Sequence, residues 1–210
     1  MYAGTCRDLT SAQVAERSAL RPPAVRLRVP AVDDPGDPGM GFGGRTAMSS
    51  RVVRFVDRTY GERIEDLSRE CGDFLVRRSD GVFAYQLAVV VDDAEMGVTE
   101  VVRGCDLLGS TARQMYLQDL LGYAHPEYAH VPLLVAPDGR RLSKRDRDLD
   151  MGELRARFAT SDELLGRLAF ALGLRPDAAP LTAERLVEGF SWDWVRDHRE
   201  SLVVGPGFLG

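Results

Sequence analysis

The sequence has no long apolar run, few cysteines and no excess of positive charge. No apolar stretch approaches the roughly 18–20 residues that a membrane-spanning helix needs, so no membrane partner is expected. The three cysteines, Cys6, Cys71 and Cys105, are widely spaced and form no Cys-x-x-Cys pair. This spacing disfavours both a disulfide framework and a zinc site made from cysteines alone. The formal net charge of −5 gives no sign of general nucleic-acid binding, although a local basic surface remains compatible with it.

The N-terminus also lacks the charged and apolar segments of a secretion signal, so a cytoplasmic location is expected. The chain has 210 residues, of which 44% are hydrophobic and 28% are charged. These values are typical of a globular protein with one domain and a small appendage.

Composition and periodicity divide the chain into four parts, residues 1–30, 31–50, 51–150 and 151–210. The first part predicts a helix that begins at Thr10 or Ser11, ends at Leu20 and is followed by a strand over 25–29. The second part is rich in Gly, Pro, Asp and Ser and predicts a flexible loop. The third part alternates strands with helices, and the fourth predicts helices throughout.

The third part supports an α/β nucleotide-binding domain, to which the fourth adds a helical appendage. An apolar run over 83–91 fits either a helix or a strand. A helix is predicted over 110–121, with Gly122 as its C-cap. Strands are predicted over 52–56, 73–78, 98–103 (buried) and 130–135. In the appendage, helices are predicted over 153–159, 161–173, 182–189 and 191–202.

A short basic segment follows the predicted turn at 137–139 and reads Arg141-Leu142-Ser143-Lys144-Arg145. A lysine beside a serine on such a loop suits stabilisation of the negative charge that develops on pyrophosphate when ATP is attacked. The alternative is a solvated basic turn without a catalytic role.

Four further stretches accompany this segment in a fixed order, namely Asp73–Gly81, Tyr85–Asp93, Gly97–Gly104 and Ser110–Gln114. Together with Arg141–Arg145 they resemble, in order and spacing, the catalytic domain of glutamyl-tRNA synthetases, which are class I aminoacyl-tRNA synthetases. That family usually has proline where this chain has Ala112. The resemblance implies a Rossmann-like class I catalytic domain whose first part is missing, since nothing here resembles the family's His-rich first signature.

Two N-terminal stretches, Tyr2–Arg7 and Arg21–Pro30, resemble the shorter paralogues, the glutamyl-queuosine tRNA(Asp) synthetases, which lack the anticodon-binding domain. Only about 65 residues follow the basic segment, which is short for a typical domain. The chain also lacks the histidine common after the Arg-Gly-x-Asp motif, which ends here at Asp106. This branch implies activation of glutamate with ATP and Mg²⁺ and transfer of glutamate to queuosine at the wobble position. The implied RNA partner is the anticodon stem-loop of tRNA(Asp), and the full-length protein is expected to be a monomer.

The resemblance assigns Tyr85 and Arg103 to glutamate binding, and Lys144 to ATP binding and catalysis. A guanidinium at the end of a strand can bind a carboxylate through two hydrogen bonds, and a phenol can bind the other end of the amino acid. The alternatives are a core tyrosine with a satisfied hydroxyl and a structural ion pair of Arg103, for which Asp106 is a candidate partner.

Tyr2 and Cys6 match the last two ligands of the family's zinc knuckle, a Cys-x-Cys followed later by Tyr-x-x-x-Cys. The first pair is absent from this sequence. Two ligands are too few for a closed tetrahedral site, so Zn²⁺, which the full-length family binds, is not expected to bind tightly here. Cys6 is then expected to be a free thiol.

The missing first signature suggests a truncated gene model, an internal start or a split gene. A chain of this length alone is expected to expose surface that the missing strands cover, with poor stability or association as the result. Two other functions stay open: a non-catalytic remnant that binds tRNA or a partner, and a fragment of a glutamate–tRNA ligase that charges the 3′ end.

Overall fold

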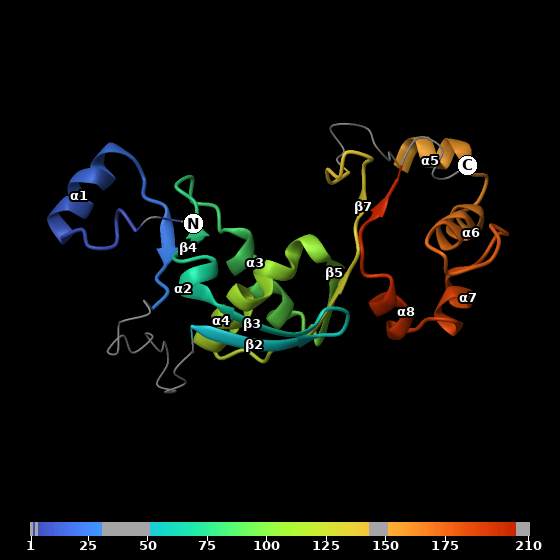
Figure 1. Ribbon diagram of the computed structural model, residues 1–210. Helices are drawn as coiled ribbons and strands as arrows, with labels where there is room; N and C mark the ends of the chain where they lie inside the picture. Colours follow the sequence, from blue (N-terminus) through green and yellow to red (C-terminus); the bar gives the residue numbers. More distant parts are fainter. Residues whose placement is uncertain (1, 3, 31–50, 143–150, 205–210) are drawn as a thin grey trace. The chain divides into compact units, whose positions relative to one another are not determined.

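The computed structural model describes residues 2, 4–30, 51–142 and 151–204, which form a mixed α/β structure (Figure 1). The chain divides into two compact units. The first consists of Met1–Arg103 and Leu107–Ala129, and the second of Gly104–Asp106 and His130–Gly210. The α/β class predicted from the sequence is confirmed, while the division into four parts stays a prediction. None of the helices in the described part of the chain combines the length and the apolar composition that crossing a membrane requires.

A four-stranded sheet has the order β3-β2-β6-β5. Its strands are β2 (Val52–Asp57), β3 (Gly61–Asp66), β5 (Glu100–Gly104) and β6 (Glu127–Val131). β2 pairs antiparallel with β3 and parallel with β6, the latter through Asp57 and Tyr128. Val53 and Phe55 of β2 are buried, whereas Arg54 and Val56 between them are exposed. This period of two means that β2 has one face in the core.

Helices cover the buried face of β2 and β3 (Figure 1). They are α2 (Leu67–Glu70), α3 (Tyr85–Glu95) and α4 (Thr111–Leu121). Met115 and Leu117 of α4 pack in one hydrophobic cluster with Phe55 and Tyr128. Gly122 ends α4 in the left-handed region, at φ 74°, as its predicted C-cap role requires. The core of the first unit therefore lies between α4 and the sheet.

The N-terminal segment joins the first unit through a strand. Helix α1 (Ser11–Leu20) begins after Thr10, whose hydroxyl accepts a hydrogen bond from the Gln13 N–H, and the helix matches the prediction. β1 (Val25–Leu27) pairs antiparallel with β4 (Phe74–Arg77). Because no residue of α1 is buried, this segment is held mainly by β1 and by the polar contacts described below.

In the second unit, β7 (Leu134–Val135) and β8 (Leu202–Val203) pair parallel, and the described residues between them in the sequence form four helices. These are α5 (Met151–Arg157), α6 (Ser161–Ala171), α7 (Ala183–Glu188) and α8 (Trp192–Asp197). Side chains of Thr160, Thr182 and Ser191 cap three of them. A Cβ on Gly166 of α6 would lie 2.1 Å from the Ala179 carbonyl oxygen, so this close approach requires glycine.

Several local predictions differ from the structure. The ambiguous run over 83–91 belongs mostly to helix α3, and the polar segment 61–66 forms the unpredicted strand β3. The strand predicted over 130–135 was wrong in its bounds, because β6 ends at Val131 and β7 starts at Leu134, on either side of Pro132, which has no N–H to donate. The helix predicted over 191–202 ends at Asp197. The strand predicted over 98–103 exposes Glu100 and Val102 and is only partly buried. The loop predicted over 31–50 lies outside the described residues.

Candidate glutamate-binding site

Arg103 lies near the end of β5 and directs its guanidinium at the start of α4. Nη1 donates a hydrogen bond of 2.7 Å to the side-chain oxygen of Gln114. Nη2 donates to the hydroxyl of Thr111 at 2.9 Å and to the carbonyl of Leu107 at 3.4 Å. The guanidinium carbon also lies 5.4 Å from the ring centroid of Tyr128. These contacts fix the direction in which the positive charge is presented.

Two glutamine side chains extend this arrangement from α4 to α3. The Gln114 amide nitrogen donates to the Gln86 oxygen at 2.9 Å, and the Gln86 nitrogen donates to the Ser110 hydroxyl at 3.0 Å. Gln114 is only 2% exposed. The buried amide of Gln114 and the half-buried amide of Gln86 therefore connect Arg103 to the first turn of α3.

Tyr85 is the first residue of α3 and directly precedes Gln86. It is 52% exposed, which does not fit the alternative of a core tyrosine. The structure thus brings the segments of both predicted glutamate-binding residues together through Gln86 and Gln114. Sequence reasoning missed these two glutamines.

Burial also affects two titratable groups near Arg103. It raises the pKa of Asp93 on α3, and the positive charge of Arg103 partly opposes this effect. Burial likewise raises the pKa of Tyr128, against the hydrogen bond from Gln118. Asp93 is therefore a further carboxyl group whose protonation responds to the charge on Arg103.

In the second unit, Asp106 is paired with the start of the basic segment. Nη1 of Arg141 lies 2.5 Å from the Asp106 carboxylate, and the Arg141 backbone forms an antiparallel bridge with Val135. A Cβ on Gly104 would lie 2.7 Å from the same carboxylate, so a larger residue there would require the Asp106 side chain to move. Leu142 is half-buried. The structure places Asp106 against Arg141, where the sequence suggested Arg103 as its partner.

The remaining residues of the predicted signature loop, Ser143, Lys144 and Arg145, lie outside the described residues. The assignment of Lys144 to ATP binding and catalysis therefore stays a prediction.

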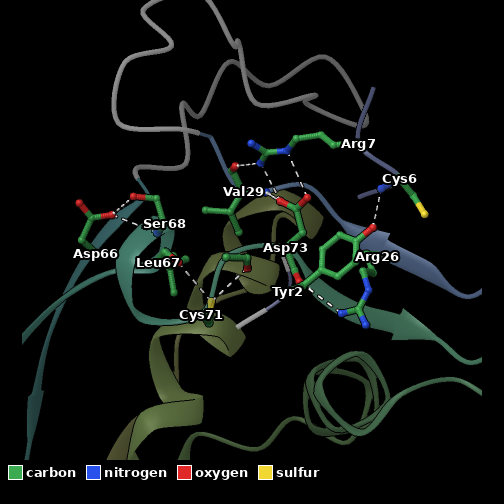
Figure 2. A network of polar contacts seen from close by, with 11 residues as sticks. Tyr2, Cys6, Arg7, Arg26, Val29, Asp66, Leu67, Ser68, Cys71 and Asp73 are labelled. Atoms are coloured by element: carbon green, nitrogen blue, oxygen red, sulfur yellow. Dashed lines mark hydrogen bonds and ion pairs between the residues drawn. The ribbon is translucent and has the colours of Figure 1, made fainter. Parts of the chain in front are cut away.

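Tyr2 and Cys6, the predicted half of a zinc site, are neighbours in the structure (Figure 2). The Tyr2 phenol oxygen accepts a hydrogen bond of 2.8 Å from the Cys6 N–H, and the Arg26 guanidinium lies 4.3 Å from the Tyr2 ring centroid. Nη1 of Arg17 lies 4.0 Å from the Cys6 sulfur. Within the described parts of the chain, no three His, Cys, Asp or Glu residues are grouped to hold a metal ion. The described residues therefore do not fit a zinc site.

The cysteines differ in environment. Cys6 is exposed, whereas Cys71 is half-buried and its thiol lies 3.4 Å from the Leu67 carbonyl and 3.3 Å from the Gly72 carbonyl. Burial raises the pKa of Cys71 to about 11. Thiolate is the reactive form, so at pH 8 iodoacetamide should label Cys6 well before Cys71, as measured by peptide mass spectrometry. As a control, both thiols should react at similar rates in denaturant. Equal rates in the folded protein would contradict the difference in burial between Cys6 and Cys71.

Comparison with known proteins identifies the relatives of this chain. Residues 45–164 match the family model described as tRNA synthetases class I (E and Q), catalytic domain. The chain is 45% identical over 178 residues to a glutamyl-Q tRNA(Asp) synthetase of Pseudomonas fluorescens, covering 85% of this chain and 49% of the relative. It is 44% identical over 207 residues to the protein of the same name in Pseudomonas paraeruginosa, covering 97% of this chain and 60% of the relative. The chain thus spans about half of the length of these relatives.

Solved structures agree at the level of the fold. A glutamate tRNA ligase from Elizabethkingia meningosepticum, crystallised in complex with its amino acid, superposes with a TM-score of 0.68 at 20% identity, over 97% of this chain and 40% of that one. A glutamate-tRNA synthetase from Elizabethkingia anophelis gives the same TM-score of 0.68 at 21% identity, over 97% of this chain and 41% of that one. At this identity the likeness establishes the fold alone.

Proposed function

The chain belongs to the family of class I tRNA synthetases for glutamate and glutamine, and we propose that it serves the ATP-dependent activation of glutamate and its transfer to queuosine in tRNA(Asp). The observation that carries the proposal is the oriented guanidinium of Arg103, which Gln114 and Gln86 connect to the first turn of α3. The name shared by relatives at 43–45% identity supports queuosine as the acceptor. The proposal includes the anticodon stem-loop as the RNA partner, a cytoplasmic location and a monomeric state.

Glutamate binding follows from the chemistry of two side chains. A guanidinium binds a carboxylate through two parallel N–H···O bonds, which selects for the acid over neutral amino acids. In the proposal Arg103 binds a carboxylate of glutamate, and the exposed phenol of Tyr85 provides a hydrogen bond to the amino acid. If that carboxylate is the one on the side chain, the charge on Arg103 distinguishes glutamate from glutamine, whose side-chain amide is uncharged and has a single acceptor oxygen.

Activation and transfer are two displacement steps. An oxygen of the glutamate α-carboxylate attacks the α-phosphorus of ATP, and the bond to the β-phosphate oxygen breaks to release pyrophosphate. Lys144 and Mg²⁺ would neutralise the charge that develops on the leaving group. A hydroxyl of the queuosine base then attacks the acyl carbon, loses its proton and displaces AMP, which leaves an ester on the base.

The test is ATP–pyrophosphate exchange without tRNA, for this chain and for the chain extended upstream in its genomic reading frame. We expect exchange that requires glutamate and is not supported by glutamine or aspartate. Exchange in neither protein would contradict the enzyme proposal and favour a remnant that only binds tRNA or a partner.

The acceptor is tested separately by charging tRNA(Asp) with radiolabelled glutamate and separating its nuclease fragments. Label is expected in the anticodon fragment. Label in the 3′-terminal fragment would instead identify a glutamate–tRNA ligase.

A further inference from the structure

We infer that Gln114 and Gln86 are positioning residues that hold Arg103 for the carboxylate of glutamate, an inference that rests on the proposed function. Neither glutamine needs to touch the substrate for this role. Gln114 acts through its direct hydrogen bond to Arg103, and Gln86 acts through Gln114.

Three hydrogen bonds run in one direction along four side chains. Arg103 donates to the Gln114 oxygen at 2.7 Å, Gln114 donates to the Gln86 oxygen at 2.9 Å, and Gln86 donates to the Ser110 hydroxyl at 3.0 Å. A primary amide is suited to the middle positions because it accepts on one atom and donates from the other. A carboxylate at position 114 could accept from Arg103 but could not donate to Gln86.

Because Gln114 is buried, losing either of its hydrogen bonds is expected to be costly. Its side chain is 2% exposed, so an unmade bond there cannot be replaced by bulk water, and each lost partner leaves a buried polar group unsatisfied. An arginine side chain also has several rotatable bonds, and fixing it before the ligand arrives lowers the entropy cost of binding. The amides therefore preorganise the cation.

The choice of a neutral partner matters as well. An amide orients the guanidinium without adding negative charge beside it, whereas glutamate at position 114 would compete with the ligand's carboxylate. Asp93 already lies near enough to respond to the charge on Arg103. A second carboxylate, at position 114, would further weaken the attraction between Arg103 and an anionic substrate.

Three variants separate positioning from simple stability. Gln114→Met removes both hydrogen bonds at similar volume, Gln114→Glu keeps an acceptor for Arg103 but adds charge, and Gln86→Met removes the acceptor for Gln114 without adding charge. Gln118→Met is the matched control, because Gln118 is also buried in α4 but bonds to Tyr128. Glutamate affinity is measured by calorimetry, the KM values for glutamate and ATP by pyrophosphate exchange, and Tm by thermal unfolding, in the active form of the protein.

Gln114→Met should raise the glutamate Kd and KM about 10–100-fold while leaving the KM for ATP nearly unchanged. Gln114→Glu should weaken glutamate binding at least as much with little loss of Tm, and Gln86→Met should raise the glutamate Kd by a smaller factor, because Gln86 acts only through Gln114. The inference is overturned if Gln114→Met and Gln118→Met lower Tm equally and leave glutamate affinity unchanged. If the wild-type protein binds glutamate but shows no exchange, the proposed function is contradicted, and the Kd values of the variants still test the positioning role. If the wild-type protein does not bind glutamate, the proposed function and the positioning inference are both overturned.

Discussion

Replacing Arg103 with methionine is expected to reduce glutamate-dependent pyrophosphate exchange about 100–1000-fold. The substitution keeps much of the side-chain volume but removes the charge and every N–H donor of the guanidinium. Loss of a charged hydrogen-bonding group at a site of this kind costs about 3–4 kcal/mol, which corresponds to that change in rate. The exchange rate at saturating ATP and varied glutamate measures the effect, which should appear mainly in kcat/KM for glutamate.

Two further variants control this experiment. Arg103→Lys keeps the charge but cannot form a two-pronged contact with a carboxylate, so its activity should fall between wild type and Arg103→Met. Arg54→Met removes an exposed arginine from β2 and should leave exchange unchanged. Wild-type KM for glutamate in Arg103→Met would show that Arg103 has only a structural role.

The sequence predicted elements whose boundaries are marked by local chemistry. Helix α1 begins after Thr10 and helix α4 ends at Gly122, because a hydroxyl cap and a left-handed glycine are local signals. Strand β3 carried no such signal. Its residues Gly61–Asp66 are mostly polar, and they form a strand because β2 provides the backbone hydrogen bonds. β3 therefore forms through its pairing with β2, and the periodicity of its own sequence does not indicate that pairing.

The candidate site was predictable to a similar extent. Tyr85 and Arg103 were predicted from the motifs around them. Gln86 and Gln114 form their hydrogen bond only because α3 packs on α4, which the sequence motifs do not show. One signal was available: Gln114 and Gln118 are four residues apart in a predicted helix, with Met115, Tyr116 and Leu117 between them. Polar side chains repeated on one side of a buried helix indicate internal hydrogen bonds, although not their partners.

Asp73 shows how strongly such distant contacts can matter, since its partners lie 66 and 44 residues away in the sequence (Figure 2). Its carboxylate accepts hydrogen bonds from Arg7 at 2.7 and 3.2 Å and from the Val29 N–H at 3.0 Å. Nη2 of Arg7 also donates to the Val29 carbonyl. Asp73 itself is only 8% exposed. The carboxylate thus fastens the N-terminal segment beside strand β4.

Asp73→Ala should therefore lower the free energy of unfolding by about 2–4 kcal/mol, because it leaves the Val29 N–H without its acceptor and removes the carboxylate that pairs with the Arg7 guanidinium. The lower part of this range applies if water reaches Arg7, which is 24% exposed. Urea unfolding measures the loss, and hydrogen exchange of β1 (Val25–Leu27) should accelerate most because that strand depends on this contact.

Asp80→Ala is the matched control, since Asp80 forms an exposed ion pair with Arg78 in a turn of the same unit. Its removal should cost at most about 0.5 kcal/mol. Asp73→Asn should fall between the two, because an amide oxygen can still accept from Val29 but carries no charge for Arg7. If Asp73→Ala and Asp80→Ala unfold at the same urea concentration, and β1 exchanges at its wild-type rate, the N-terminal segment is held by strand pairing alone.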